Sequence, residues 1–572
     1  MIVAEQILQT NLPKVHRNRL LKPSATWLLK GLLCEREINR FAQTYPNLQG
    51  LEFVEHVLDF FKFSFSARDS ELDNIPTDGR LIVVANHPIG SLDGLALLKL
   101  LCSVRDDVKI LANDMLQAVP PLSDLMIPVP VFNRKVPKAG RNEAMKLLYQ
   151  HLDNDGVLIV FPAGEVSRLR PQGVRDNYWH TGFLKMARRA KAPVLPIHIA
   201  AQNSAWFYGA SMVYKPLATL LLVQEMFRQQ HRHIKLRIGE VVPSKAISAS
   251  SLALPDLAKL FRRDVYRLGA NKASAFKTYK PIARAESRKL LKSEVESSEL
   301  LGQTADGKFI YLHRYQGNSA VLREIGRLRE IAFRAVDEGT GKRRDLDNYD
   351  TWYTQLVLWD AHALEIAGAY RLGCAKSIVE QQGLEGLYSH SLFAYHPERI
   401  RPYIAQGLEL GRSFVQPKYW GKRSLDYLWQ GIGAFLVTHP QYRYLFGPVT
   451  MSASLPLVAQ DALVQFFSEQ FPDVDQLAES RTPFVAQSRP LPSKSACYLD
   501  DLNHLKHFLA HQGASIPTLY KQYADLCEVG GVRFLGFNVD ADFANAVDGL
   551  VLVDIERLKP QKRARYIKKP AS

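Results

Sequence analysis

The sequence has 572 residues, more than one ordinary hydrophobic core accommodates, so it predicts two or more domains. Apolar residues make up 47% of the chain, a share that is typical of globular proteins and excludes a disordered polypeptide. The net charge of +16 fits a nucleic acid, an anionic lipid or an acidic protein as partner, but no zinc-finger spacing or aromatic RNA-binding signature supports nucleic acid.

The cysteine positions and the hydropathy indicate which kinds of site and segment to expect in this protein. The cysteines have no paired spacing, which favours reduced thiols in a cytosolic setting and argues against a zinc site. The first 21 residues carry charges where a signal peptide needs an apolar core, and no stretch approaches the ~20 apolar residues of a membrane-spanning helix. We therefore expect no bound metal and no transmembrane segment. The five cysteines are Cys34, Cys102, Cys374, Cys497 and Cys527.

The chain begins with mostly helical segments in which basic and apolar residues interleave. Lys14, Arg17, Arg19 and Lys22 lead into Trp27 and a run of leucines, as in a helix that lies on a membrane surface. The aromatic-rich segment 53–65 and the apolar helix predicted over 217–227 have similar character, although simple packing on the domain explains all three equally well. The pattern predicts peripheral attachment to the inner face of the cytoplasmic membrane.

A buried strand over Leu81–Ala85 is followed by a loop and then by a helix with apolar residues at 95, 98 and 101. The loop carries His87 and Asp93, at the carboxyl end of a strand, where ligand sites of α/β proteins gather. A neutral imidazole can take a proton from a substrate hydroxyl, and a nearby carboxylate can orient the ring and stabilise its charged form. The alternative is a loop histidine that only caps the helix.

Strands and helices then alternate up to residue 242, which predicts a mixed or parallel sheet covered by helices. The expected strands are 108–112, 157–161, 194–199 and 231–242, and the expected helices are 141–152 and 183–190.

Four blocks in this region resemble those of the glycerolipid acyltransferases of the lysophosphatidic acid type. The first block contains Asn86, His87 and Asp93, with five residues between His87 and Asp93 where the family has four. The resemblance covers roughly residues 1–245 and implies an α/β acyltransferase fold with His87 as general base and Asp93 as its orienting partner. The other blocks are 130–134, 161–168 and 194–197, and together the blocks imply that the substrate is bound by Asn86, Asn133, Arg134, Phe161, Pro162, Gly164, Glu165 and Arg168.

The third block departs from the family's usual Phe-Pro-Glu-Gly-Thr-Arg, because Glu165 is displaced by two positions. In the family this block handles a phosphorylated acceptor. A lyso-aminolipid has no phosphate, so the altered block suits such an acceptor.

From 246 to 300 the chain becomes polar and reads as a helical connector followed by a linker. The second half, 301–572, then restarts with its own pattern of strands and helices. Strands are expected over 354–359, 364–372, 407–415, 444–446, 532–537 and 549–555, and helices over 321–336, 425–437, 455–471 and 517–526.

The second half resembles the ornithine N-acyltransferase branch of the GNAT-like superfamily, which is related to acyl-homoserine lactone synthases. The residues that carry this resemblance lie in 343–350, 366–371, 407–415, 447–452, 540–543 and 548–554. It implies an α+β fold in which Arg371 and Arg412 bind substrate. Such a reaction needs a base for an α-ammonium group, and Glu409 is the candidate. A structural ion pair of Glu409 with Arg412 or Arg371 is the alternative.

The place of the GNAT pyrophosphate loop, Gln416–Arg423, has only one glycine, Gly421. Backbone amides there can still hold a phosphate at the start of the next helix, with Lys418, Lys422 and Arg423 adding positive charge. A degenerate loop suits an acyl carrier protein donor, which lacks the nucleotide pyrophosphate. We expect an acyl carrier protein thioester or acyl-CoA as co-substrate and no tightly bound cofactor.

The two resemblances together imply an enzyme of the ornithine lipid synthase family, with ornithine, lyso-ornithine lipid, acyl carrier protein and a membrane lipid surface as partners. Three alternatives stay open. The chain could be a lysophospholipid O-acyltransferase whose second domain acylates a different amine, or one whose second domain is a non-catalytic acyl-carrier docking module. The third alternative is a basic nucleic-acid-binding protein.

Overall fold

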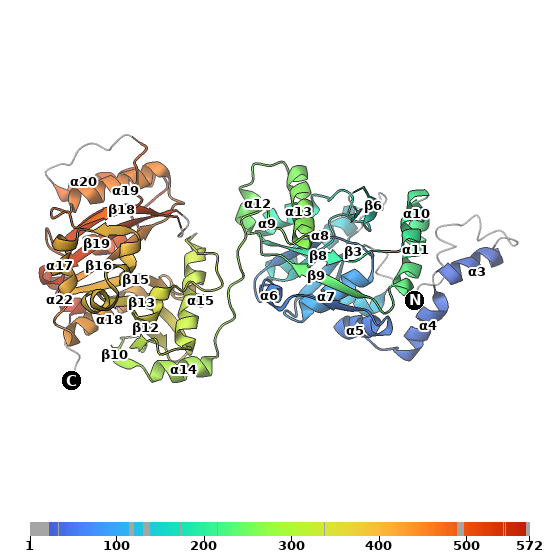
Figure 1. The fold of residues 1–572 in the computed structure, drawn as a ribbon, viewed down its shortest axis with the longest axis horizontal. Coiled ribbons are helices and arrows are strands. Elements are labelled where there is room, and N and C mark those ends of the chain that lie inside the picture. The colour runs from blue at the N-terminus through green and yellow to red at the C-terminus, as the bar shows by residue number, and fades with distance from the viewer. Residues whose placement is uncertain are drawn as a thin grey trace. The chain divides into compact units, whose positions relative to one another are not determined.

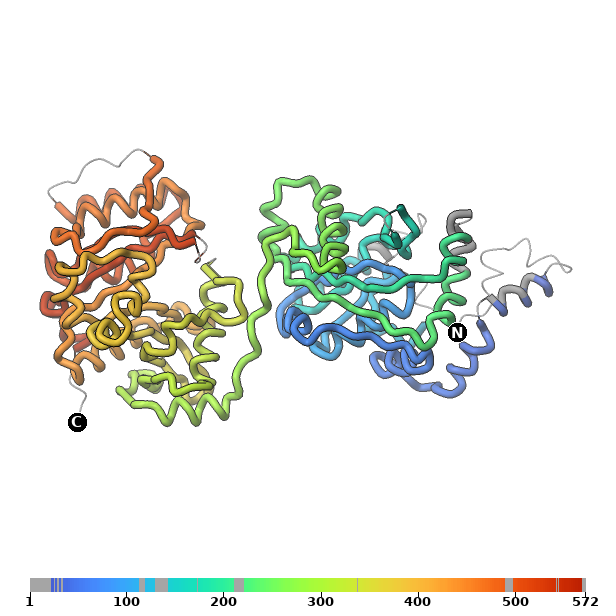
Figure 2. Tube along the Cα trace, viewed as in Figure 1, coloured from blue at the N-terminus to red at the C-terminus, as the bar shows by residue number. Residues whose placement is uncertain are grey.

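The computed structural model describes residues 22–32, 34–113, 119–129, 138–171, 173–213, 215–336, 338–488, 497–541, 543 and 545–567. The chain divides into two compact units, Met1–Pro281 and Ile282–Ser572, which are drawn as a ribbon in Figure 1 and as a tube in Figure 2. The division falls inside the stretch 246–300 that the sequence marks as a connector.

The first unit is built on a seven-stranded sheet with the strand order β1-β9-β8-β2-β5-β3-β4. Neighbouring strands are parallel except for β8 and β9, which are antiparallel, so the sheet is mixed, as predicted. The strands are β1 (Ser64–Ser66), β2 (Leu81–Ala85), β3 (Val108–Asn113), β4 (Met126–Val129), β5 (Val157–Val160), β8 (Val194–Ala200) and β9 (His233–Ile238).

Helices cover both faces of this sheet, which is why the central strand β2 is apolar at every position. Leu81 and Val83 contribute to one core with α5 (Gly50–Phe60) and α7 (Leu92–Cys102). Ile82 and Val84 contribute to the other with α8 (Lys138–Asp153), α9 (Gly182–Ala190) and α13 (Leu254–Gly269) (Figure 1). This three-layer arrangement leaves the carboxyl ends of β2 and β5 as the place where loops can form a site.

The remaining elements of the first unit are short or lie outside these layers. They are α3 (Lys22–Leu32), α4 (Glu35–Thr44), α6 (Asp69–Leu72), α10 (Ala205–Val213), α11 (Lys215–Arg228), α12 (Ser244–Ser248) and the hairpin of β6 (Arg168–Arg170) with β7 (Gly173–Arg175). Every helix in the described part of the chain is too short or too polar to cross a bilayer.

The second unit has an eight-stranded sheet with the order β10-β11-β12-β13-β15-β16-β19-β18. All neighbours are antiparallel except β15 and β16. The strands are β10 (Glu299–Gln303), β11 (Phe309–Arg314), β12 (Thr354–Asp360), β13 (Glu365–Cys374), β15 (Gly407–Val415), β16 (Tyr444–Met451), β18 (Val532–Asp540) and β19 (Ala546–Asp554), and β14 (Phe393–Tyr395) pairs separately with β17 (Ala478–Ser480).

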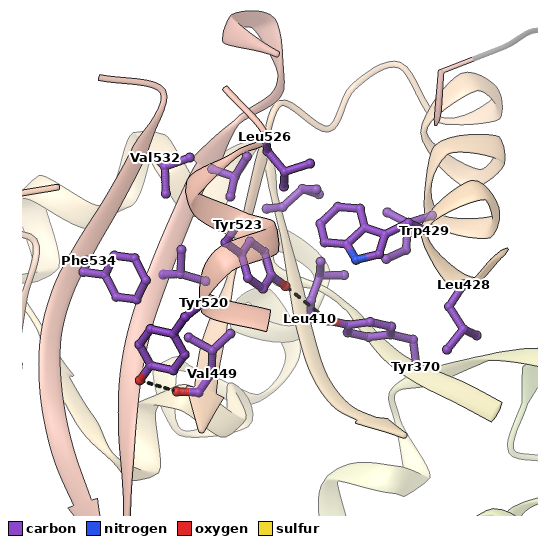
Figure 3. Close-up of a cluster of buried hydrophobic side chains, with 14 of the residues drawn as sticks. Tyr370, Leu410, Leu428, Trp429, Val449, Tyr520, Tyr523, Leu526, Val532 and Phe534 are labelled. Carbon is purple, nitrogen blue, oxygen red and sulfur yellow. Dashed lines mark hydrogen bonds between the residues drawn. The ribbon is translucent and has the colours of Figure 1, made fainter. Parts of the chain in front are cut away.

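One face of this sheet packs against a large core under α18 (Ser424–Thr438), α19 (Leu457–Gln470), α20 (Tyr498–His511) and α21 (Thr518–Ala524). Figure 3 shows its centre, where the hydroxyls of Tyr370 and Tyr523 lie 3.2 Å apart and Tyr520 donates a hydrogen bond of 2.9 Å to the carbonyl of Val449. These tyrosines therefore contribute buried rings without leaving their hydroxyls unpaired.

The opposite face is covered by two separate groups of helices. The first group is α14 (Arg288–Glu296) with α15 (Ala320–Ala335), and the second is α16 (Ala375–Gln382) with α17 (Pro397–Ala405). The last helix of the chain is α22 (Pro560–Tyr566). Leu291 and Val295 of α14 are buried in the second unit, whereas Phe261 and Val265 of α13 are buried in the first.

The parallel pair β15 and β16 separates part-way along its length. Gly407–Glu409 pair with Tyr444–Phe446, and the ladder ends there although both strands continue. Beyond this point β15 remains paired with β13, and β16 remains paired with β19. Glu409 therefore lies at the last paired position before the two strands diverge.

Candidate active sites

The first site lies in the loop after β2, where His87 and Asp93 meet. The Nδ1 of His87 lies 3.1 Å from the Oδ2 of Asp93, whose side chain is 0% exposed. The same carboxylate accepts hydrogen bonds from the backbone N–H groups of Ile89, Gly90 and Gly94 at 3.0, 3.2 and 2.9 Å. Because Asp93 is held in this way, it favours the proton on Nδ1 and leaves Nε2 of His87 for a substrate.

The extra residue in this loop is accommodated at Gly90, which has a positive φ of 92°. A Cβ atom there would lie 2.6 Å from a side-chain carbon of Val166. The five-residue spacing therefore still brings His87 and Asp93 into contact.

The electrostatics of the pair favour a charged imidazole. Burial disfavours the charged form of His87, but the carboxylate of Asp93 outweighs burial and raises the pKa of His87 above its usual value. Burial likewise opposes the charge on Asp93, and the imidazole and the backbone N–H groups outweigh it, so the pKa of Asp93 is lowered. Asp93 is therefore an anion that stabilises the imidazolium formed when His87 accepts a proton.

The third block packs directly against His87. The ring of Phe161 stacks on the imidazole with centroids 4.1 Å apart, and the N–H of Ser167 donates to the His87 carbonyl at 2.8 Å. The N–H of His180 donates to the carbonyl of Pro162 at 2.9 Å, and Gly164 has a positive φ of 63°. Of the predicted third-block residues, Phe161 therefore contacts His87 directly, and Pro162 and Gly164 belong to the loop that follows it.

Arg168 and Glu165, also from this block, form an ion pair of 3.7 Å. Nε and Nη1 of Arg168 are buried without a hydrogen-bond partner among the described residues. The guanidinium therefore keeps donors for an acyl or headgroup oxygen. Asn133 and Arg134 of the second block lie outside the described residues.

Asn86 has a different position from that of a substrate-facing group. Its amide donates to the carbonyl of Ile199 at 2.9 Å and accepts from the N–H of the same residue at 2.8 Å. These two hydrogen bonds join the end of β2 to β8 and hold the neighbouring His87 in place.

Asp176 is a buried carboxylate at this site for which the sequence carries no signal. It accepts hydrogen bonds from the N–H of His87 at 3.2 Å, the hydroxyl of Ser167 at 2.5 Å and the indole of Trp179 at 2.8 Å. Burial raises the pKa of Asp176 despite these donors. Only the fold shows that this residue, distant in sequence, supports the backbone of His87.

The second site surrounds Glu409, at the end of the ladder between β15 and β16. Its Oε1 accepts a hydrogen bond of 2.7 Å from the N–H of Ser389, and its Oε2 accepts one from the hydroxyl of Tyr353. That hydroxyl in turn accepts from the N–H of Tyr388 at 2.9 Å. Burial raises the pKa of Glu409, so the carboxyl group is prepared to take up a proton.

Arg371 and Arg412 lie near Glu409, but within the described residues their ion pairs are with aspartates. The Nη1 of Arg371 lies 2.6 Å from Asp347 and 3.3 Å from Asp350. Arg412, whose backbone has a positive φ of 48°, lies 3.5 Å from Asp347. In Arg371, which is 0% exposed, Nε and Nη2 have no hydrogen-bond partner in the described structure.

The loop before α18 carries the predicted donor-binding residues. Lys418 pairs with Glu365, Lys422 lies 5.1 Å from the centre of the Tyr419 ring, and Arg423 lies 3.4 Å from Asp426. Gly421 has a positive φ of 73°. The cations therefore gather just before the start of a 15-residue helix, where backbone N–H groups are unpaired. No group of three or more His, Cys, Asp or Glu side chains among the described residues is arranged to hold a metal ion.

Two families match the chain. The family described as Acyltransferase matches residues 7–274, and the Acetyltransferase (GNAT) domain matches residues 328–430. A glycine N(alpha)-acyltransferase from Bacteroides thetaiotaomicron is 33% identical over 303 residues, which cover 50% of this chain and 89% of that protein.

Two other relatives have related activities. A lyso-glycine lipid O-acyltransferase from the same organism is 30% identical over 257 residues, covering 44% of this chain and 91% of that protein. An L-ornithine N(alpha)-acyltransferase from Brucella abortus is 29% identical over 256 residues, covering 42% of this chain and 82% of that protein.

Proposed function

Because the chain belongs to the acyltransferases of amino-acid lipids, with an acyltransferase domain followed by a GNAT domain, we propose that its two units carry out two successive acylations. The second unit joins a 3-hydroxyacyl chain to the α-amine of ornithine. The first unit then acylates the 3-hydroxyl of that lyso-lipid. The observation that carries the proposal is that each unit has its own acid–base pair, His87 with Asp93 and Glu409 with Tyr353.

In the O-acylation, Nε2 of His87 takes the proton of the lyso-lipid hydroxyl as its oxygen attacks the thioester carbonyl. The imidazolium is stabilised by Asp93 until the tetrahedral intermediate collapses. The C–S bond then breaks, and the thiolate of the carrier takes the proton from His87. Arg168, with its two unpaired donors, is the proposed contact for an oxygen of the acceptor.

In the N-acylation, an α-ammonium must lose a proton before its nitrogen can attack the thioester. Glu409 is the proposed base, and its raised pKa suits that role because it can hold the proton after transfer. Tyr353 donates to this carboxylate and orients it. The amine nitrogen attacks the thioester carbonyl and forms the amide bond as the C–S bond breaks. The second proton that this nitrogen loses passes to the sulfur, so the carrier leaves as a thiol.

The proposed acyl donor is an acyl carrier protein thioester. Lys418, Lys422 and Arg423 supply positive charge before α18, and the net charge of the chain is +16. An acidic carrier protein is attracted to such a surface, and its phosphopantetheine needs no site for a nucleotide pyrophosphate. Acyl-CoA is the alternative donor.

We further propose that the enzyme works at the inner face of the cytoplasmic membrane, because its proposed product is a lipid with two acyl chains. The helix α3 exposes Trp27, at 78%, beside Lys30, and these residues line a hollow with Arg36 of α4 and Gln224 of α11. An exposed indole among cations is suited to the interface of an anionic bilayer. Lys14, Arg17 and Arg19 lie outside the described residues.

Lipid extracts of cells that express the chain test the function. The expected result is a new amino-acid lipid with two acyl chains, one linked through an amide and one through an ester. The Glu409→Gln variant should make neither lyso-lipid nor product, yet still bind acyl carrier protein. If Glu409→Gln makes normal amounts of the lipid, Glu409 is not the base, and if the second unit binds the carrier without ever acylating an amine, it is a docking module.

A further inference from the structure

A line of buried polar side chains crosses one face of the second sheet. We define this polar seam as Gln355, Arg371, Glu409, Thr450 and Asp548, one residue from each of five neighbouring strands. Four of them are at most 3% exposed, and Thr450 is partly buried.

The strand registers put these residues on the same face. Gln355 is the direct partner of Arg371, and Thr450 is the direct partner of Asp548. Arg371 is opposite Gly411, two residues from Glu409, and Glu409 is opposite Phe446, four residues from Thr450. Since side chains alternate along a strand, even spacings keep all five on one side of the sheet.

A basic and an acidic side chain lie toward opposite ends of the polar seam. Next to Gln355, Nε and Nη2 of the fully buried Arg371 have no hydrogen-bond partner among the described residues, although its Nη1 pairs with Asp347 and Asp350. At the other end, Asp548 accepts a hydrogen bond of 2.7 Å from the hydroxyl of Thr450. Glu409, the proposed base, lies between them in strand order.

Tyr388 contacts two arginines and also lies within electrostatic reach of Asp548. The guanidinium carbons of Arg371 and Arg412 each lie 4.9 Å from the centre of its ring. Burial raises the pKa of Tyr388, and the charges of Asp548 and Asp540 add to this effect, so both aspartates lie within electrostatic reach of the same tyrosine. Burial, and then the charge of Asp540, raise the pKa of Asp548 to about 7 against the opposite effect of Arg412.

Such a site is complementary to an amino acid that carries two ammonium groups. The Nε and Nη2 edge of a guanidinium binds a carboxylate through two parallel hydrogen bonds, and a buried donor without a partner gains most from such a ligand. A buried carboxylate likewise gains a counter-charge when an ammonium group pairs with it.

We propose that Asp548 determines the acceptor specificity by pairing with the side-chain ammonium of a diamino acid, while Arg371 binds the α-carboxylate. This inference rests on the proposed N-acylation, and it separates a cationic acceptor from glycine, which has no side chain to reach Asp548. The relatives include proteins named for glycine and for ornithine, so the two acceptors are the relevant choice.

The test compares ornithine with norvaline, which has the same carbon chain without the terminal amine, and with glycine. The full chain and its Asp548→Asn variant are assayed for kcat/KM with a 3-hydroxyacyl carrier protein. The asparagine keeps an acceptor for Thr450 but removes the charge. We expect the unaltered protein to favour ornithine over norvaline by roughly thirtyfold or more, and Asp548→Asn to lose most of that ratio.

Asp461→Asn is the matched control. Asp461 is a buried carboxylate of the same unit that accepts hydrogen bonds from the N–H groups of Gln487 and Ser488, and it lies on α19 under the opposite face of the sheet. Its removal should leave the ornithine-to-norvaline ratio unchanged. If Asp548→Asn does not fold, Thr450→Val replaces it and should reduce the same ratio by a smaller factor.

Calorimetric binding of ornithine and norvaline decides the inference even if no acyl transfer occurs. A protein that acylates no amino acid overturns the proposed function, whereas preferential binding of ornithine that Asp548→Asn abolishes still supports the site. An unaltered preference in Asp548→Asn, or a preference of the unaltered protein for glycine, overturns the assignment of Asp548 and leaves N-acylation intact.

Discussion

His87 has one ring nitrogen committed to Asp93 and the other left for a substrate hydroxyl, so its removal should stop O-acylation selectively. We expect His87→Ala to reduce the second acylation by roughly a hundred- to ten-thousandfold, the usual contribution of a positioned general base. Lyso-lipid should accumulate because the second unit is untouched. Mass spectrometry of lipid extracts measures both species.

His180→Ala is the control for this experiment, because the N–H of His180 bonds to Pro162 of the third block while its side chain is exposed. That variant should make the diacyl lipid at the normal rate. A normal rate in His87→Ala would instead rule out His87 as the base.

The pH profile of O-acylation should show the influence of Asp93. A general base must be neutral, so activity is lost as the pH falls through the pKa of His87. Because Asp93 raises this pKa, we expect the acid limb of kcat/KM above the ordinary value of about 6.5.

Asp93→Asn removes the charge that raises the pKa and leaves burial, which lowers it. The acid limb should therefore move to lower pH, and the rate on the plateau should fall because the imidazolium loses its counter-charge. An acid limb that stays in place in Asp93→Asn would show that another group titrates.

The sequence could predict residues that act through a local motif, and it could not predict those that act across the fold. His87 and Asp93 are six positions apart in one loop, so their contact was predictable and is confirmed. Asp176 reaches His87 from 89 positions away, and Tyr353 reaches Glu409 from 56 positions away. No local pattern distinguishes these residues, because only the strand order brings them together.

At the scale of single elements, α3 is where we expect membrane contact. Trp27 is 78% exposed on this short helix, beside basic residues, so Trp27→Ser should weaken binding of the full chain to vesicles of anionic lipid. High salt should release part of the bound protein because it screens surface charge. Co-sedimentation with anionic and with neutral vesicles measures both effects.

Val529→Ser is the control, since Val529 is 97% exposed and belongs to the second unit, none of whose described elements is assigned to the membrane. It should bind vesicles as the unaltered chain does. Equal binding of Trp27→Ser and Val529→Ser would exclude α3 as a contact.

Elements with a strong apolar pattern were predictable, and weaker ones were not. The apolar strand β2 and the hairpin of β12 and β13 agree with the ranges expected from the sequence. The strand β16 continues to Met451, five residues beyond its predicted end at Phe446, because Pro448 lies past the end of the β15 ladder, where one edge of β16 has no partner strand. The helix α20 was missed because only Leu505 and Leu509 are buried.

At the scale of the whole molecule, two units with separate cores predict two separable enzymes. The segment 270–287 contains no helix or strand and joins α13, which is buried in the first unit, to α14, which is buried in the second. A fragment that starts near residue 300 would lack α14. The core residues that Leu291 and Val295 of α14 cover would then be exposed, so the cut belongs near the division between Pro281 and Ile282.

Cutting the chain there should leave both activities intact, because few apolar groups lie in the joining segment. The fragment 282–572, given ornithine and a 3-hydroxyacyl carrier protein, should form only lyso-lipid. The fragment 1–281, given that lyso-lipid and an acyl donor, should complete the second acylation. Mixing the two fragments should restore both acylations, at a rate of diacyl lipid formation that depends on the concentration of the fragments. The intact chain should not show this dependence. A folded fragment 282–572 that binds the carrier but never acylates an amine would leave the second unit as a docking module.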